Sequence, residues 1–259
     1  METEFNIESF DIKLDTNVIG RNFIYSEEVD STNSTLLNKS FGNINGTTLL
    51  AEKQTKGRGR KDRQWYSARG QNLTFSILLT DKKYFNKNFN LINFAAALAV
   101  AMSIENLYQL KIELKWPNDV LIGGKKVAGV LIESSSKGDK LERVVIGIGF
   151  NVNQTSFQGN FNLPPSSLKI EVGQSIEREM LLAEFLNVFE EILENVVDNP
   201  AWILREWKER CRMLGEKISI TEDDKVKYGI FDDIDDDGFL ILKTEKGLEK
   251  IYYGDVSLV

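Results

Sequence analysis

One basic stretch with interspersed glycines lies between two apolar segments, and this arrangement limits the folds open to the chain. It places five cations within eight positions: Lys56, Arg58, Arg60, Lys61 and Arg63. Gly57 and Gly59 separate them, and Trp65 follows. The flanking residues 47–51 and 73–79 have the length and composition of buried strands. We therefore predict a loop between two strands of a sheet.

The charge of this loop contrasts with the rest of the chain. Between Glu52 and Arg69, seven basic residues face two acidic ones, an excess of five in a chain of net charge −7. Ordering such a loop is costly, because its charges repel and glycine loses much conformational freedom on folding. An anionic ligand offsets that cost, because backbone N–H groups and bidentate arginines bind its oxygens and the flat face of Trp65 can pack on a ring. We predict a mobile loop that closes on an anionic ligand.

Two other interpretations of the basic stretch remain open from its residues alone. The first is a solvated run of charges. The second is DNA binding, because Arg58-Gly59-Arg60 resembles a segment that inserts into the narrow minor groove of AT-rich DNA. Such segments normally carry flanking prolines and lie in disordered tails. The position between two strands therefore favours the anion-binding loop.

The composition describes a globular protein and excludes several kinds of catalysis. At 259 residues, 42% of them hydrophobic, the chain has room for one large domain or a large and a small one. The sequence contains no histidine, which excludes Ser-His-Asp and Cys-His catalysis and His-bearing zinc sites. Phosphoryl or adenylyl transfer fits the side chains that the sequence does contain, because lysine, arginine and Mg²⁺ supply most of that chemistry.

The sequence predicts a cytoplasmic protein without a membrane span. The longest apolar run, residues 94–102, is about half of the ~20 residues that a bilayer span requires. Residues 1–5 lack the basic segment and apolar core of a signal peptide. Cys211 is the single cysteine, so no internal disulfide forms, and its arginine neighbours favour a buried or bystander thiol over a nucleophile.

Hydrophobic periodicity predicts an α+β fold with a mixed or antiparallel sheet. The expected strands are 21–25, 47–51, 73–79, 112–116, 120–122, 127–133 and 143–150, of which those between 111 and 153 form an antiparallel meander. The expected helices are a short one through Leu36 and Leu37, an alanine-rich core helix over 91–107, an amphipathic helix after Ser175, and one over 200–213. Residues 1–20 show only weak alternation.

From Gly215 the pattern changes to short alternating strands. We expect strands at 217–221, 225–231, 239–244 and 248–253, which together form a small β-barrel. The predicted domains are therefore residues 1–213 and 214–259. The acidic run 232–238 lacks the terminal glutamate and flanking helix of a calcium loop, so it is predicted to be a solvated hairpin tip.

Three further groups of residues are candidates for ligand binding. Ser31, Thr32 and Asn33 either cap a helix or bind a polar ligand at its N-terminus. Glycine is unfavourable inside a strand, so Gly147 and Gly149 indicate either a bulge or a flat group packed on the backbone. Asn118 and Asn151 have the donors and acceptors needed to recognise a purine edge, although Asn118 is equally a turn residue.

Taken together, these motifs resemble those of biotin protein ligases. The matching stretches, in order, are 30–33 (DSTN), 54–65 (QTKGRGRKDRQW), 115–119 (KWPND) with 124–129 (GKKVAG), and 147–151 (GIGFN). The resemblance covers nearly everything after residue 20. It implies a catalytic domain like that of class II aminoacyl-tRNA synthetases, followed by an SH3-like barrel. The implied reaction joins biotin to ATP as biotinyl-5′-AMP, releases pyrophosphate and transfers biotin to a lysine of a carboxyl carrier domain.

The resemblance also implies a role for each matching residue. Lys126, Arg58 and Arg60 are the expected catalytic residues: Arg60 and Lys126 face the carboxylate and phosphates, and Arg58 contacts the biotin or its adenylate. The expected biotin-binding residues are Ser31, Thr32, Asn33, Gln54, Gly57, Arg58, Gly59, Arg60, Lys126 and Gly129. The expected ATP- and adenylate-binding residues are Trp65, Lys115, Asn118, Gly149 and Asn151. Mg²⁺ is an expected companion of ATP, with its protein ligands unassigned.

Two departures from the family pattern affect these expectations. Asp62 stands where the family usually has glycine, which implies a stiffer loop or a weaker affinity for anions. Residues 1–20 are too short for the DNA-binding domain of repressor-type members, so we expect a monofunctional ligase that does not bind nucleic acid. The expected partner is a biotin carboxyl carrier protein, and exposed strand edges leave a homodimer possible. The competing hypotheses are a lipoate-type ligase of the same fold and a non-catalytic nucleic-acid-binding module.

Overall fold

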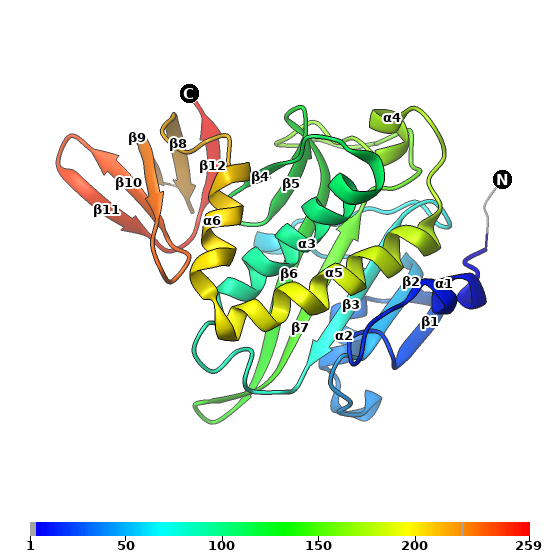
Figure 1. Cartoon of the computed structure of the whole chain (residues 1–259). Coiled ribbons are helices and arrows are strands. Elements are labelled where there is room, and N and C mark those ends of the chain that lie inside the picture. Colours follow the sequence, from blue (N-terminus) through cyan, green and yellow to red (C-terminus); the bar gives the residue numbers. More distant parts are fainter. Residues whose placement is uncertain (1–3, 224) are drawn as a thin grey trace.

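The computed structural model describes residues 4–223 and 225–259 (Figure 1). A seven-stranded sheet and its helices form the larger part, and a smaller five-stranded sheet lies at one side, next to the helix that precedes it in sequence. The expected α+β class is confirmed. The expected likenesses to synthetases and to SH3 barrels stay predictions, as does the domain boundary.

The large sheet has the strand order β1-β2-β3-β7-β6-β5-β4. Its strands are β1 Phe23–Val29, β2 Thr48–Gln54, β3 Leu73–Leu79, β4 Glu113–Lys115, β5 Asp119–Ile122, β6 Lys125–Lys137 and β7 Lys140–Phe150. β1 and β2 are parallel, whereas every other neighbouring pair is antiparallel. The mixed sheet and the antiparallel meander predicted over residues 111–153 are therefore confirmed, although β1 continues four residues beyond the predicted strand.

Helices lie on both faces of this sheet. They are α1 Ile7–Lys13, α2 Thr32–Leu37, α3 Leu91–Tyr108, α4 Leu168–Val172, α5 Arg178–Asp198 and α6 Pro200–Arg210. α2 packs on the face opposite α3 and α5, where Leu36 joins a small apolar cluster with side chains of β2, β3 and β7. α3 and α5 run side by side across the sheet (Figure 1). Small alanines let α3 approach the strands closely, so the predicted core helix is confirmed. Within the described residues α3 alone is long and apolar enough to cross a membrane, and 67% of it is buried inside the molecule, as in the core helix of a globular protein.

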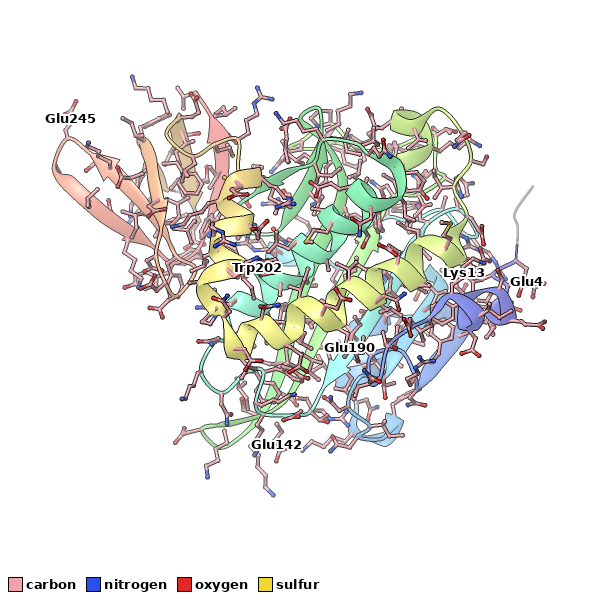
Figure 2. All side chains as sticks on the ribbon, in the orientation of Figure 1. Glu4, Lys13, Glu142, Glu190, Trp202 and Glu245 are labelled. Atoms are coloured by element: carbon pink, nitrogen blue, oxygen red, sulfur yellow. The ribbon has the colours of Figure 1, made fainter. Side chains whose placement is uncertain are left out.

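The first twenty residues are more ordered than their weak alternation predicts. Residues 1–3 lie outside the described part, but α1 follows, and Phe10 packs against Phe23 with ring centroids 4.5 Å apart. Glu190 on α5 accepts hydrogen bonds from the backbone N–H groups of residues 17–19, which ties this segment to the helical layer (Figure 2). Contacts distant in sequence thus order a segment that has little local signal.

The C-terminal residues form a five-stranded antiparallel sheet in the order β11-β10-β9-β8-β12. Its strands are β8 Lys217–Glu222, β9 Lys225–Ile234, β10 Leu240–Thr244, β11 Gly247–Ile251 and β12 Asp255–Leu258. The first four match the predicted strands within a few residues. The prediction lacked β12, because its four residues contain one buried hydrophobic side chain, Val256, and give no alternating pattern.

The acidic hairpin tip is not the freely solvated turn that the sequence predicts. The tip connects β9 to β10, and its Gly238 is buried against Phe94 of α3. The Gly238 carbonyl accepts a hydrogen bond of 3.2 Å from Trp116 Nε1, and the Asp237 carbonyl accepts one of 3.2 Å from Asn90. The tip therefore joins the smaller sheet to the larger part of the molecule.

Candidate active site

A cavity of about 480 Å³ lies on the face of the large sheet opposite α3 and α5. Alternate strand residues point to opposite faces, so Ile146 and Ile148 of β7 enter the helical core while Gly147 and Gly149 face the cavity. Of the fifteen residues assigned to the site from sequence, all except Gly57 line this cavity. Gly57 lies behind the wall, where a Cβ would meet the Trp65 carbonyl and the Gln54 side chain.

One end of the cavity, here called the polar end, is a network of uncharged side chains: Ser31, Thr32, Asn33, Gln54 and Ser76. Gln54 Oε1 accepts hydrogen bonds from the backbone N–H and the hydroxyl of Thr32, at 2.8 and 3.1 Å. The hydroxyl of Ser76 lies 2.7 Å from Thr32 Oγ1 and 2.6 Å from Asn33 Oδ1. These side chains are oriented before any ligand arrives.

The sequence left capping and ligand binding open for residues 31–33, and the structure separates the two. Ser31 is the N-cap of α2, with its hydroxyl accepting from the backbone N–H of Ser34. Asn33 instead donates to the Leu131 carbonyl and, at 2.8 Å, to Glu133. Asn33 thus joins the start of α2 to β6. Ser76, which the sequence analysis did not select, completes the network from β3.

The two strand glycines make room for the protein's own side chains. A Cβ at position 147 would overlap the amide of Asn33, and a Cβ at position 149 would overlap the indole of Trp65. The flat groups inferred from these glycines therefore include an amide and an indole of this chain. Trp65 Nε1 is buried, and none of the described residues gives it a hydrogen-bond partner.

The other end of the cavity, here called the cationic end, contains Arg60, Arg63, Lys115 and Lys126. Lys126 Nζ lies 2.5 Å from one oxygen of Asp119, and Lys115 Nζ lies 4.0 Å from the other. Burial lowers the pKa of the Lys115 ammonium, and Asp119 only partly opposes this shift. The whole cavity is lined by five cations and two carboxylates, an excess of three positive charges that favours an anionic ligand.

The basic loop, residues 56–63, reaches from this cavity of about 480 Å³, here called the catalytic cavity, to the C-terminal sheet. Its centre is a short 3₁₀ helix, Arg60–Asp62, and the side chain of Asp62 lies outside the described residues, so its expected effect on the loop remains a prediction. Arg63 pairs with Asp255, and Lys61 donates to the Thr221 carbonyl at 3.3 Å. The C-terminal sheet thus holds the loop over the cavity.

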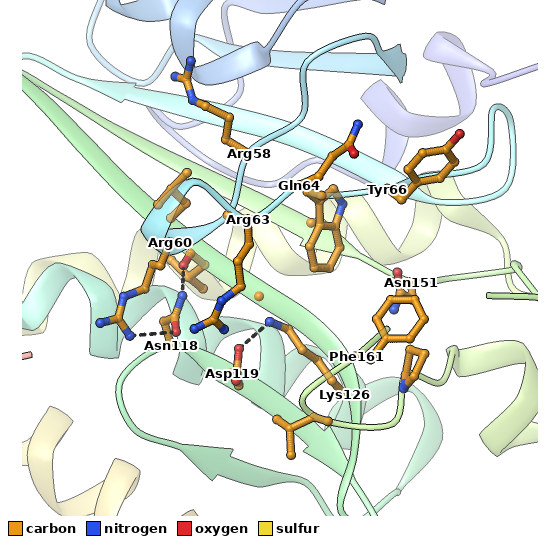
Figure 3. A pocket seen from close by; sticks show the side chains of 18 of the residues that line it. Arg58, Arg60, Arg63, Gln64, Tyr66, Asn118, Asp119, Lys126, Asn151 and Phe161 are labelled. Carbon is orange, nitrogen blue, oxygen red and sulfur yellow. Dashed lines mark hydrogen bonds and ion pairs between the residues drawn. The ribbon is translucent and has the colours of Figure 1, made fainter. Parts of the chain in front are cut away.

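Arg58 and Arg60 point in different directions, although only one residue separates them. Arg58 points away from the cationic end, where Arg60, Arg63 and Lys126 gather (Figure 3). It pairs with Glu133 at 3.0 Å and donates to the hydroxyl of Ser34. Arg60 faces inward, and its two hydrogen bonds, to Asn118 Oδ1 and the Gly254 carbonyl, are both 3.4 Å long. Burial lowers the pKa of the Arg60 guanidinium.

Asn118 and Asn151 each donate one amide N–H to the protein itself. Asn118 donates to the Val130 carbonyl at 2.5 Å, which fixes the turn between β4 and β5 beside β6 (Figure 3). Asn151 donates to the Ser166 carbonyl at 3.0 Å and is buried. In this arrangement both asparagines hold the walls of the cavity in place.

The sequence analysis missed a segment that closes one side of the cavity. Residues 157–163 and Pro165 line it, and Phe161 and Asn151 are both lining residues (Figure 3). Backbone hydrogen bonds from Lys126 to Pro164 and from Ser166 to Lys126, both 2.9 Å, hold this segment against β6. The irregular sequence has no period that would have revealed this contact.

The donor groups of the described residues suit Mg²⁺ that is held chiefly by a nucleotide. Within residues 4–223 and 225–259 no cluster of three or more Asp, Glu, Cys or His side chains could hold a metal ion. Asp119 is the carboxylate next to Lys115 and Lys126. Mg²⁺ is commonly bound by one or two carboxylates together with substrate phosphates, and this arrangement is compatible with that mode.

Comparisons with known proteins agree with this geometry. Residues 25–151 match the model of the biotin/lipoate A/B protein ligase family, and residues 213–259 match that of the biotin protein ligase C terminal domain. The bifunctional ligase/repressor BirA of Bacillus spizizenii is 34% identical over 251 residues, which cover 95% of this chain and 76% of the relative. The biotin–(acetyl-CoA-carboxylase) ligase of Paracoccus denitrificans is 34% identical over 235 residues, which cover 88% of this chain and 96% of the relative.

A solved structure extends the similarity to three dimensions. The biotin protein ligase from Aquifex aeolicus, determined in complex with biotin and ATP, matches with a TM-score of 0.80 and 31% sequence identity. The match covers 92% of this chain and 99% of that one. Both parts of the chain therefore have counterparts in one known enzyme.

Proposed function

The chain belongs to the biotin protein ligase family, and we propose that its cavity binds biotin at the polar end and ATP at the cationic end. It is a ligase that activates biotin with ATP and transfers the biotinyl group to a biotin carrier protein of a carboxylase. The observation that carries the proposed placement is the division of one cavity into an end lined by hydrogen-bonding hydroxyls and amides and an end that gathers four of the five lining cations.

The polar end fits the cyclic urea of biotin. A urea offers a carbonyl acceptor and two N–H donors, and the hydroxyls and amides of Thr32, Asn33 and Gln54 can meet both kinds of group. Because these side chains already orient one another, little conformational entropy is lost when biotin binds. The valeryl carboxylate then extends toward Lys126.

The cationic end addresses the charge problem of adenylation. The biotin carboxylate must attack the α-phosphorus of ATP, which brings two anionic groups together. Lys126, Arg60 and Lys115 neutralise that repulsion and fix the carboxylate opposite the departing pyrophosphate. One carboxylate oxygen forms the new P–O bond as the bond to pyrophosphate breaks. Mg²⁺ bound to the phosphates would draw charge from the leaving group.

Binding of the nucleotide requires Trp65 to move. The indole lies against Gly149 with no space for a second ring between them, whereas the family resemblance assigns both residues to the binding of ATP and the adenylate. We propose that adenine displaces the indole from Gly149 and then stacks on it. The buried Nε1 without a partner supports this step, because displacement gives that N–H access to an acceptor.

We also propose that the catalytic domain ends at residue 213 and the C-terminal domain begins at residue 214. The match of residues 213–259 to a separate C-terminal model supports this boundary. We place the enzyme in the cytoplasm, where a chain with one cysteine and no disulfide is stable in the reduced state.

The proposal is tested by incubating the purified enzyme with biotin, ATP, Mg²⁺ and a purified biotin carrier domain. We expect biotin to be attached to the carrier, and no attachment when its acceptor lysine is replaced by arginine. Lipoate in place of biotin is the specificity control. Modification with lipoate but not with biotin would refute the assignment of the polar end to biotin.

A further inference from the structure

Glu133 on β6 contacts the polar end from outside the catalytic cavity. It does not line the cavity, and its side chain is 28% exposed. Its Oε2 accepts a hydrogen bond of 2.8 Å from Asn33 Nδ2, and its Oε1 pairs with Arg58 at 3.0 Å. The sequence motifs do not include this carboxylate, and the reaction described above does not use it.

The surroundings of Asn33 favour a single orientation of its amide. Nδ2 faces the Leu131 carbonyl at 3.2 Å and the Glu133 carboxylate at 2.8 Å, and both of these groups can only accept hydrogen bonds. A rotated amide would place its oxygen against two acceptors. Oδ1 therefore faces the hydroxyl of Ser76, which must donate to it across 2.6 Å.

This orientation passes from Asn33 to a residue that lines the polar end. A hydroxyl group has one proton, so Ser76, which donates to Asn33, must accept from Thr32 across their contact of 2.7 Å. The Thr32 proton is shared between Ser76 and Gln54 Oε1, which lies 3.1 Å from Thr32 Oγ1. The donors thus run in one direction and end on the Glu133 carboxylate.

Burial makes this direction costly to reverse. Thr32 and Asn33 are each 3% exposed and Ser76 is fully buried, so water does not replace a hydrogen bond that is lost here. The charged acceptor strengthens the bond from Asn33 and, by polarisation, the bonds behind it. With its proton already committed, Thr32 Oγ1 can only accept from a ligand. The polar end therefore presents an acceptor to an N–H group, such as those of a cyclic urea.

Arg58 balances the negative charge of Glu133. Its Nη2 lies 3.0 and 3.2 Å from the two carboxylate oxygens and 2.8 Å from the hydroxyl of Ser34. It points away from the cations gathered at the other end of the cavity (Figure 3). Because the pair carries no net charge, Glu133 orders the polar end without repelling the anionic substrates.

We propose that Glu133 is a positioning residue that sets the hydrogen-bonding direction of the polar end and thereby its preference for a ligand that donates an N–H group. The inference rests on the ligase function proposed above. Glu133 lies outside the cavity and acts only through Asn33. Its contribution therefore concerns the binding of biotin and leaves the binding of ATP unchanged.

Exchanging the carboxylate and the amide between the two positions tests this role. Glu133→Gln leaves one acceptor for Asn33 and Arg58 together, and Asn33→Asp places an acceptor against the carboxylate. Each change should raise the Kd for biotin by about tenfold or more, measured by isothermal titration calorimetry.

The double variant restores the direction of the chain. Position 133 then donates to position 33, which still accepts from Ser76, and the remaining amide oxygen at 133 faces Arg58. Only the Leu131 carbonyl meets an acceptor, so recovery is partial. We expect the loss of affinity to be smaller than the product of the two single losses by about fivefold or more.

Glu142→Gln is the matched control. Glu142 is 31% exposed and pairs with Lys39 near the hairpin between β6 and β7. This variant should bind biotin like the wild type, and Glu133→Gln should keep the wild-type KM for ATP. Wild-type biotin affinity in Glu133→Gln, or a double variant whose loss equals the product of the single losses, would overturn the role of Glu133. A wild-type enzyme that does not bind biotin would instead refute the proposed function, and this inference with it.

Discussion

The two ends of the catalytic cavity differ in how far their side chains are hydrogen-bonded to one another. At the polar end, hydrogen bonds of 2.6 to 3.1 Å connect Thr32, Asn33, Gln54 and Ser76 into one network, and this network is complete without a ligand. At the cationic end, the two hydrogen bonds that Arg60 makes to described residues are long and reach neutral oxygens, and Trp65 has a buried N–H without a partner among these residues.

This difference follows from the charges of the two ligands. A neutral urea gains little from long-range attraction, so its site must supply oriented donors and acceptors in advance. A polyphosphate is attracted by excess positive charge, and it can complete a site whose cations are only partly neutralised by carboxylates. The polar end therefore sets specificity in our account, and the cationic end is assembled by the substrate that it activates.

The largest expected effect is that of Lys126→Ala. Removing the cation that faces both carboxylate and phosphate should lower biotin-dependent pyrophosphate exchange by about 10² to 10³-fold. The folded state should persist, because the Lys126 side chain lies at the edge of a cavity and not in the core. The adjacent Lys125→Ala is the control, since Lys125 pairs with Glu171 away from the cavity. Exchange at the wild-type rate in Lys126→Ala would remove this residue from the mechanism.

The two strand glycines allow each end to be disturbed separately. A methyl group at Gly147 meets Asn33, and one at Gly149 meets Trp65. Overpacking costs about 1–3 kcal/mol, so we expect a rise in KM of about 10- to 100-fold in each variant. Gly147→Ala should raise the KM for biotin, and Gly149→Ala the KM for ATP. Steady-state kinetics with each substrate varied in turn measures the two KM values in each variant. If both variants changed the KM for biotin and the KM for ATP alike, the division into two ends would be contradicted.

A pH profile tests the cationic end alone. The protonated Lys115 is the active form, and burial lowers its pKa from the ordinary value of 10.5. The charge is therefore present below the lowered pKa and is lost as pH rises through it. We expect kcat/KM for ATP to begin falling at a pH below the ordinary lysine range. In Lys115→Arg, which keeps its charge, that fall should disappear, and an unchanged profile would assign it to another group.

The smallest expected effect concerns the contact between the basic loop and the C-terminal sheet. Arg63 pairs with Asp255 near the surface, and exposed ion pairs contribute at most about 1 kcal/mol. Arg63→Ala should therefore raise the KM for ATP by less than about fivefold. The difference from wild type should shrink at high ionic strength, and Lys53→Ala, which removes an ion pair with Glu28, should show none. A loss as large as that of Lys126→Ala would place Arg63 at the reacting groups.

Local patterns in the sequence predicted the elements better than the contacts between them. Short continuous apolar runs identified β2 and β3 around the basic loop, and the alanines identified α3, because burial selects such residues directly. The assigned residues also met in one cavity. The opposite directions of Arg58 and Arg60 could not be predicted, since partners distant in sequence, Glu133 and Gly254, decide them. The segment over 157–163 was missed for the same reason.

Exchange of labelled pyrophosphate into ATP, measured with and without biotin and Mg²⁺, tests the central claim most directly. The claim is that one cavity joins a neutral head group at its polar end to a nucleotide at its cationic end. We expect exchange that requires both biotin and Mg²⁺ and that is lost in Lys126→Ala. Exchange independent of biotin, or none from the folded enzyme, would contradict the assignment of these two ends to biotin and ATP.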